Sequence, residues 1–315
     1  MKNVRQTLVA AGMLLIAMVF SLGIAAAQVS PDEAALYAAF HAASQANDNA
    51  GALGAAKAYL DKFPTGQYAD AVKQWQTRAR LTRLDEAIKA KRTEDMITAG
   101  KEILAADPGN LTVVYALAFN IRRNELLASP AVYTHSEAAA AYAKEGIALV
   151  EGGKTLTGVA SFDKNATLAW MTQILAIHEG HSGSADEAIK LYEKSTALAP
   201  ADSIVGRNLY AIYSLRHADY VDAAKAYNAL PEADRGAAEP SAEAKAAREA
   251  VNREADALID SAAAFVAYGR SKGLPAATVD RVNQTLESVY KGRFPEDAAL
   301  DGLKKILAEN GAPAA

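Results

Sequence analysis

The sequence of 315 residues contains no cysteine. This absence excludes disulfide bonds, zinc–cysteine sites, covalent attachment of c-type haem, a thiol nucleophile and a lipid-modified cysteine. Aromatic residues make up only 7% of the chain, and no long run of basic residues is present. The chain therefore lacks the electrostatic footprint of a nucleic-acid-binding protein and has no polybasic patch for a membrane surface.

Alanine is abundant instead and accounts for close to a quarter of the residues. Hydrophobic residues reach 51%, which is enough for a substantial core and too many for a disordered chain. Because alanine has the highest helix propensity and lets helices approach closely, this composition predicts packed helices and not a β-sandwich or a barrel. The expected fold class is all-α, with a mild formal net charge of −4.

Residues 1–27 have the three parts of a secretory signal peptide. Lys2 and Arg5 are basic, 8–22 is apolar, and three alanines precede Gln28. The alternative is an uncleaved transmembrane anchor, but the apolar run is short and the small residues favour cleavage near Ala27–Gln28. We therefore expect a periplasmic or secreted protein without stable membrane insertion after cleavage, and the cysteine-free, alanine-rich composition suits a bacterial envelope.

A repeated helical pattern occupies the middle of the chain. Ala188, Tyr192 and Ser195 are spaced to share one helix face, and Pro200 follows as a stop signal. A second copy, 35 residues on, has Ala223 and Tyr227 at the matching offset, followed by a proline at position 231. Between these copies, 203–216 predicts another helix, with a turn expected at 217–220. Segments 56–64 and 93–110 contain further proline-terminated partial copies.

This small–aromatic–small spacing closed by proline resembles the second helix of tetratricopeptide (TPR) repeats, and 56–71 is similar to TPR variants of bacterial envelope-assembly proteins. The resemblance implies a TPR-like solenoid of helical hairpins over 28–231. The alternative is an irregular helical bundle. After residue 231 we expect a polar linker at 232–240, a C-terminal helical cap at 241–310 and a loose tail at 311–315.

His178-Glu179-Gly180-His181 is the one cluster that suggests metal chemistry. A zincin helix spaces its two histidines by four residues, whereas here the spacing is three, and Gly180 together with the following Ser182-Gly183-Ser184 weakens any helix. We interpret the cluster as a solvated turn between two helices and keep a metal or small-ligand carrier as the alternative function. No residues are arranged for catalysis or for a cofactor, so we predict a protein that is not an enzyme, although the loops near 129–136 and 150–165 could carry unrecognised groups.

The TPR resemblance also implies a binding groove lined by the first helix of each hairpin. Aromatic rings, arginines and amides there would suit an extended peptide, since they offer flat apolar contact and donors for carbonyl groups. The leading hypothesis is therefore a periplasmic interaction scaffold or adaptor that binds a protein or peptide partner. The groove residues that the family offsets indicate are Tyr115, Phe119, Arg122, Trp170, Gln173, Arg207 and Asn208.

Overall fold

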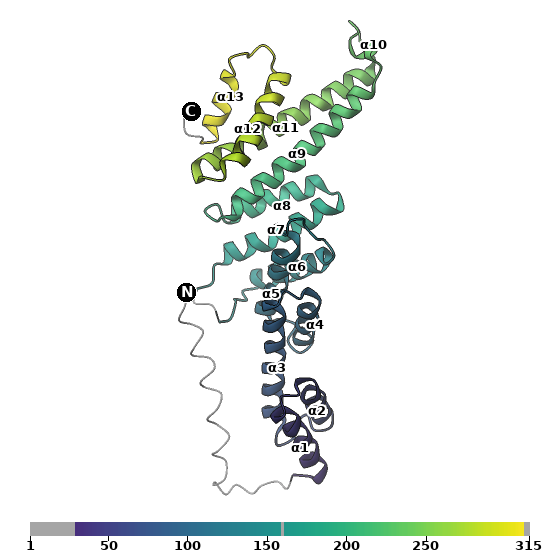
Figure 1. Cartoon of the computed structure of the whole chain (residues 1–315), viewed down its shortest axis with the longest axis vertical. Coiled ribbons are helices and arrows are strands. Elements are labelled where there is room, and N and C mark those ends of the chain that lie inside the picture. The colour runs from purple at the N-terminus through teal and green to yellow at the C-terminus, as the bar shows by residue number, and fades with distance from the viewer. Residues whose placement is uncertain (1–28, 159–160, 312–315) are drawn as a thin grey trace. The chain divides into compact units, whose positions relative to one another are not determined.

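The computed structural model describes residues 29–158 and 161–311. Every regular element within these residues is a helix and none is a strand, which confirms the all-α prediction (Figure 1). The predicted signal segment 1–27 and nearly all of the predicted tail 311–315 lie outside the described residues.

The chain divides into two units between Arg83 and Leu84, a point that falls inside helix α3 (Ala69–Lys89). The first unit contains α1 (Pro31–Gln45) and α2 (Asn49–Lys62), which pack against each other. The first unit also includes most of α3, and the second unit contains the rest of α3 and every helix after it, so the segments expected as repeats from residue 84 on and the segment expected as a cap share one unit.

The core of the first unit is small and rich in aromatic rings. Tyr59 is fully buried, and Phe40 is nearly so. The ring of Phe40 meets Trp75 edge-on with centroids 5.0 Å apart, while Tyr37 stacks on Tyr68 with centroids 3.9 Å apart. Such large rings supply much of the burial that so few residues can achieve.

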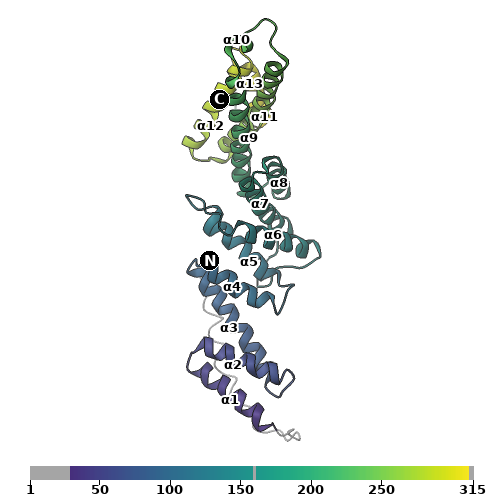
Figure 2. The same cartoon turned by 90° about the vertical axis from the view of Figure 1, so that its right-hand side faces the viewer.

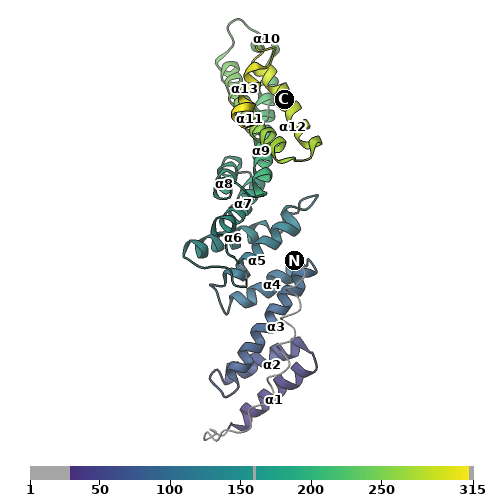
Figure 3. The same ribbon diagram turned by 90° about the vertical axis from the view of Figure 1, so that its left-hand side faces the viewer.

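The second unit begins with a series of helices in which each one packs on the next, and Figures 2 and 3 show the later members side by side. Most of them belong to one large apolar cluster that includes fully buried Leu117 and Ile121. The members are α4 (Thr93–Leu104), α5 (Leu111–Ile121), η1 (Arg122–Leu126), α6 (Ser136–Glu151), α7 (Lys164–Ser182), α8 (Ala185–Leu198) and α9 (Ile204–Ala229).

The helices after α9 do not continue the same hairpins, because α11 packs back along α9. Within the expected linker, α10 (Glu232–Arg235) forms a single helical turn. The next helix, α11 (Ala242–Lys272), packs along α9 and is covered by α12 (Ala276–Arg293) and α13 (Asp301–Glu309). A second apolar cluster joins these helices to Tyr213 of α9.

The α8 face follows the sequence pattern closely. Ala188 and Ser195 are completely buried and Tyr192 is 7% exposed, so the predicted face is the packed face. The helix ends at Leu198, two residues before Pro200. Earlier in this unit, α5 is followed directly by the π-helical turn η1.

Two expected turns are helical instead. No turn interrupts α9 at 217–220, so the expected hairpin between 203–216 and the Ala223 copy was wrong. The segment Leu215–Asp222 contains no glycine, proline or asparagine, and nothing in it stops a helix. The His178–His181 cluster likewise lies in the last turn of α7, because the residue that ends this helix is Gly183, at φ +94°.

Candidate functional site

The predicted groove residues come from α5, η1, α7 and α9, and the structure brings them together around one arginine. Arg122 is the first residue of η1, where the amide of Leu127 donates to the carbonyl of Arg122 over 2.9 Å. This wider hydrogen-bond spacing is the mark of a π-helical turn, a feature found often at functional sites.

The Arg122 side chain is only 3% exposed. Its guanidinium carbon lies 4.1 Å from the centre of the Trp170 ring and 5.8 Å from that of Phe119. Its Nε donates to Oε1 of Gln173 over 2.7 Å, whereas its buried Nη2 has no hydrogen-bond partner among the described residues. Cation–π contact and one charge-assisted hydrogen bond therefore replace a counter-ion.

This environment disfavours the charge of Arg122. Burial is the main cause that lowers its pKa to about 10, and the nearby positive charge of Arg207 lowers it further. The pKa of Arg122 is raised by the charges of Tyr115, Tyr192 and Asp202, but these effects are smaller than the lowering by burial and Arg207. Arg122 is thus a desolvated cation beside a second cation, an arrangement that an incoming negative or strongly polar group would stabilise.

Gln173 and Asn208 hold this arginine in place. Gln173 is 1% exposed and Asn208 is completely buried. Nε2 of Gln173 donates to Oδ1 of Asn208 over 2.5 Å, and Nδ2 of Asn208 donates to Oγ of Ser195 over 3.0 Å. Our prediction that these two amides contact a partner directly is corrected by their burial, since their hydrogen bonds join α7, α8 and α9 to one another.

The accessible part of the site consists of aromatic rings and one arginine. Tyr115 and Phe119 stack with centroids 5.6 Å apart, and Phe119 meets Trp170 edge-on at 6.0 Å. All three rings are half-buried, and Arg207 is exposed. Burial is the main cause that raises the pKa of Tyr115, so its hydroxyl stays protonated and able to donate.

Sequence reasoning missed two contributors to this site. Asp202 acts on the charge of Arg122, and its Oδ1 accepts from the amide of Ile204, the first residue of α9, over 2.9 Å. Ser195 was predicted only as a small packing residue, but it accepts from Asn208 and its Oγ donates to the carbonyl of Ala169 over 2.8 Å. An Asp shortly before a helical run is typical of a side chain that accepts from the backbone two residues on, whereas nothing in the sequence indicated the hydrogen bonds of Ser195.

The two histidines predicted as weak metal candidates do not converge. The His181 ring stacks on Tyr133 with centroids 3.8 Å apart. Nδ1 of His178 is buried and has no hydrogen-bond partner among the described residues. Across 29–158 and 161–311, no group of three or more His, Cys, Asp or Glu side chains is placed to hold a metal ion.

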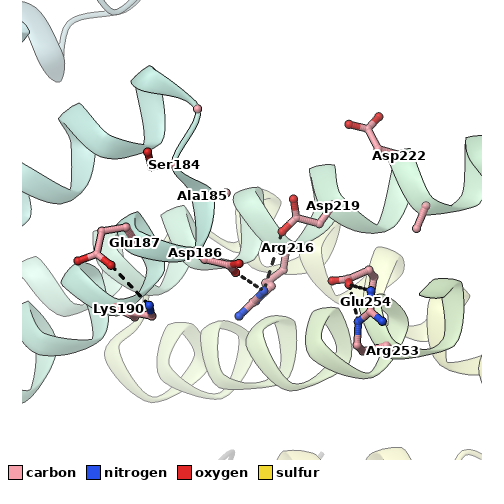
Figure 4. Close-up of a pocket in the computed structure, with 12 residues that line it drawn as sticks. Ser184, Ala185, Asp186, Glu187, Lys190, Arg216, Asp219, Asp222, Arg253 and Glu254 are labelled. Atoms are coloured by element: carbon pink, nitrogen blue, oxygen red, sulfur yellow. Dashed lines mark hydrogen bonds and ion pairs between the residues drawn. The ribbon is translucent and has the colours of Figure 1, made fainter. Parts of the chain in front are cut away.

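A cleft of about 660 Å³ lies between the start of α8, the middle of α9 and α11 (Figure 4). Its charged side chains pair with one another. Arg216 reaches toward Asp186 at 3.4 Å and toward Asp219 at 3.9 Å, and Arg253 pairs with Glu254 at 2.9 Å. Burial and then the charge of Glu254 raise the pKa of Asp219. Five acidic and three basic side chains line the cleft, so its charge is negative on balance, unlike the environment of Arg122.

No protein-family model, curated protein or solved structure matches this chain. The TPR resemblance therefore stays a prediction from the residues themselves. None of the helices in the described ranges is both long and apolar enough to cross a membrane.

Proposed function

We propose that this chain is an exported, periplasmic scaffold that binds a segment of a protein partner, and that α4–α9 are an irregular form of the TPR-like solenoid. The binding surface is the aromatic patch, defined as Tyr115, Phe119, Trp170 and Arg207 together with the buried Arg122. The partner segment supplies an apolar side chain for the rings and a carbonyl or carboxylate group for exposed Arg207, whose positive charge acts on that of buried Arg122.

The observation that carries this proposal is the uncompensated charge of Arg122. Burying a guanidinium without a carboxylate partner costs several kcal/mol in desolvation by the usual order of magnitude. No carboxylate of the described residues forms an ion pair with it, and one of its donors is unused. A packing role alone is served equally well by Met or Leu, so the retained charge favours recognition of a polar group.

Packing order supports the solenoid part of the proposal. Each helix from α4 to α9 packs on its neighbour in the chain, as repeats of helical hairpins do. The α8 face formed by Ala188, Tyr192 and Ser195 also matches the small–aromatic–small pattern. The uninterrupted α9, 26 residues long, is a departure that limits the hairpin series to the helices before it.

Site-specific photo-crosslinking in the intact envelope tests the proposal. A photoreactive phenylalanine analogue replaces Tyr115 in one variant and exposed Glu193 of α8 in a matched control. We expect a partner that crosslinks from position 115 and does not crosslink from position 193. A crosslink of equal yield from both positions would indicate non-specific proximity and would reject the aromatic patch.

The affinity of purified variants for the identified partner segment then tests whether the positive charge of the patch contributes to binding without a change in folding. Arg122 is too buried for a first test, so we choose exposed Arg207, with Lys194→Glu on α8 as the charge-matched control. Arg207→Glu should weaken binding by at least about tenfold, the effect of losing roughly 1.4 kcal/mol at an interface. Unchanged affinity in a folded Arg207→Glu variant contradicts the proposed surface.

A further inference from the structure

The loop of residues 127–135 joins η1 to α6 and is fastened at its end by one histidine. Nε2 of His135 lies 2.8 Å from Oε1 of Glu94 on α4, and Nδ1 of His135 lies 2.8 Å from Oε1 of Glu125 on η1. The amide of His135 also donates to Oε2 of Glu125 over 3.3 Å. One imidazole ring thus bridges two carboxylates from two different helices.

This geometry depends on the protonation state of the ring. A carboxylate oxygen accepts hydrogen bonds, so each of the two contacts needs an N–H on the ring nitrogen that faces it. Only the imidazolium form has both N–H groups, whereas neutral imidazole has one. Loss of one proton leaves a lone pair on one nitrogen facing a negatively charged oxygen, and that contact becomes repulsive.

Burial decides which contact is lost first. The Glu125 side chain is 11% exposed, whereas that of Glu94 is 79% exposed. A buried carboxylate without a donor is costly, while an exposed one is solvated by water at once. Neutral His135 therefore keeps its proton on Nδ1, facing Glu125, and releases Glu94.

The charged groups that act on the ring come from these two helices. Burial of His135 lowers its pKa, but hydrogen bonds and charge from Glu94 and Glu125 outweigh burial and raise the pKa above the ordinary 6.5. The loop itself has no other charged side chain, and Glu137 at the start of α6 is exposed. The bridge is therefore complete below the ordinary histidine pKa and is lost as pH rises through the raised value.

We propose that His135 is a pH-sensitive latch, in which its imidazolium clips the loop 127–135 to both α4 and η1 and its neutral form releases α4 alone. Other contacts of the loop do not involve the His135 ring. The amide of Val132 donates to the carbonyl of Glu125 over 3.0 Å, and Tyr133 stacks on His181. This latch does not depend on the aromatic patch binding a partner.

The test follows the histidine nitrogens directly in the full chain. The protein has five histidines, so nitrogen-15 labelling of histidine alone gives a resolvable long-range proton–nitrogen spectrum. We expect His135 to titrate above pH 6.5 and to become the Nδ1–H tautomer when neutral. Amide exchange of 127–135, corrected for the intrinsic effect of pH, should be severalfold slower at about pH 5.5 than at about pH 8.5, either side of an ordinary histidine pKa.

Two variants make the test decisive. Glu94→Gln, at an exposed position, keeps the fold and offers an amide that can donate to neutral Nε2, so exchange of the loop should no longer change with pH. His181→Gln removes the stack on Tyr133 and should leave the pH dependence intact. An Nε2–H tautomer for neutral His135, or the same pH dependence in Glu94→Gln as in the native protein, overturns the latch.

Discussion

The side-chain amide of Gln173 donates to the side-chain oxygen of Asn208 over 2.5 Å and accepts from Arg122 on its other side over 2.7 Å. One amide group thus joins η1, α7 and α9. All three side chains are buried, so each hydrogen bond is made where water cannot replace it.

Gln173→Met tests this junction. The methionine keeps the volume but leaves the charged Nε of Arg122 and the oxygen of Asn208 without partners. We expect the second unit to lose about 2–4 kcal/mol of unfolding free energy, the usual cost of orphaned buried polar groups. Urea unfolding followed by Trp170 fluorescence measures this in a Trp75→Phe background, since the chain has two tryptophans. Gln284→Met on the exposed face of α12 is the control and should change stability little.

The sequence was sufficient for the packed face of α8, because that face follows from helical spacing. The groove residues were instead predicted from the TPR resemblance. The sequence could not distinguish which of those residues are buried. Arg207 and Asn208 are adjacent, yet one is exposed and the other is completely buried. Only the rotation of α9 against α7 and α8 sets that difference, and local spacing does not encode it to within one residue.

Gly100 of α4 packs closely against Leu117 of α5. A Cβ built on Gly100 would lie 2.6 Å from Cδ1 and 2.7 Å from Cδ2 of Leu117, a completely buried residue of α5. Gly100→Ala should therefore destabilise the second unit by about 1–2 kcal/mol, because overpacking outweighs the better helix propensity of alanine.

The matched control for this change is Gly292→Ala in α12, where nothing lies within 4 Å of the added carbon. Without a clash, alanine should be neutral or stabilise by up to about 1 kcal/mol. Thermal unfolding of the two variants and the native protein makes the comparison. Equal effects of the two substitutions would mean that α4 and α5 do not approach as closely as described.

In the first unit, Tyr59 links α2 to two other segments. Its hydroxyl donates to Oε1 of buried Glu33 over 2.6 Å and accepts from the amide of Tyr68 over 3.0 Å. Tyr59→Phe removes both bonds and should cost about 2–3 kcal/mol. Trp75 fluorescence in a Trp170→Phe background reports on this unit during urea unfolding. Tyr37→Phe, which retains the ring that stacks on Tyr68, should cost much less.

The same hydroxyl gives the first unit a pH dependence. Burial and then the hydrogen bond to Glu33 raise the pKa of Tyr59 from 10.0 to about 12. A raised folded-state pKa contributes stability that is complete below the unfolded value and is lost as pH rises through the folded value. We expect the native protein to lose the stability advantage that it has over Tyr59→Phe between pH 10 and about 12. A constant difference between the two proteins over that range would contradict this assignment.

The unbroken α9 is the point at which the structure and the repeat pattern differ most. A proline substitution in the middle of this helix tests which of the two is right. Ala218 is exposed in the middle of this helix, where the repeat pattern placed a turn. Ala218→Pro removes a helical hydrogen bond and clashes with the preceding turn, so it should cost about 3 kcal/mol or more. Ala218→Gly, the control, keeps the amide and should cost about 1 kcal/mol. If α9 were instead two helices joined at 217–220, proline would be tolerated there and glycine would be harmless. Circular dichroism and urea unfolding of both variants therefore test whether α9, on which α11 packs, is one continuous helix.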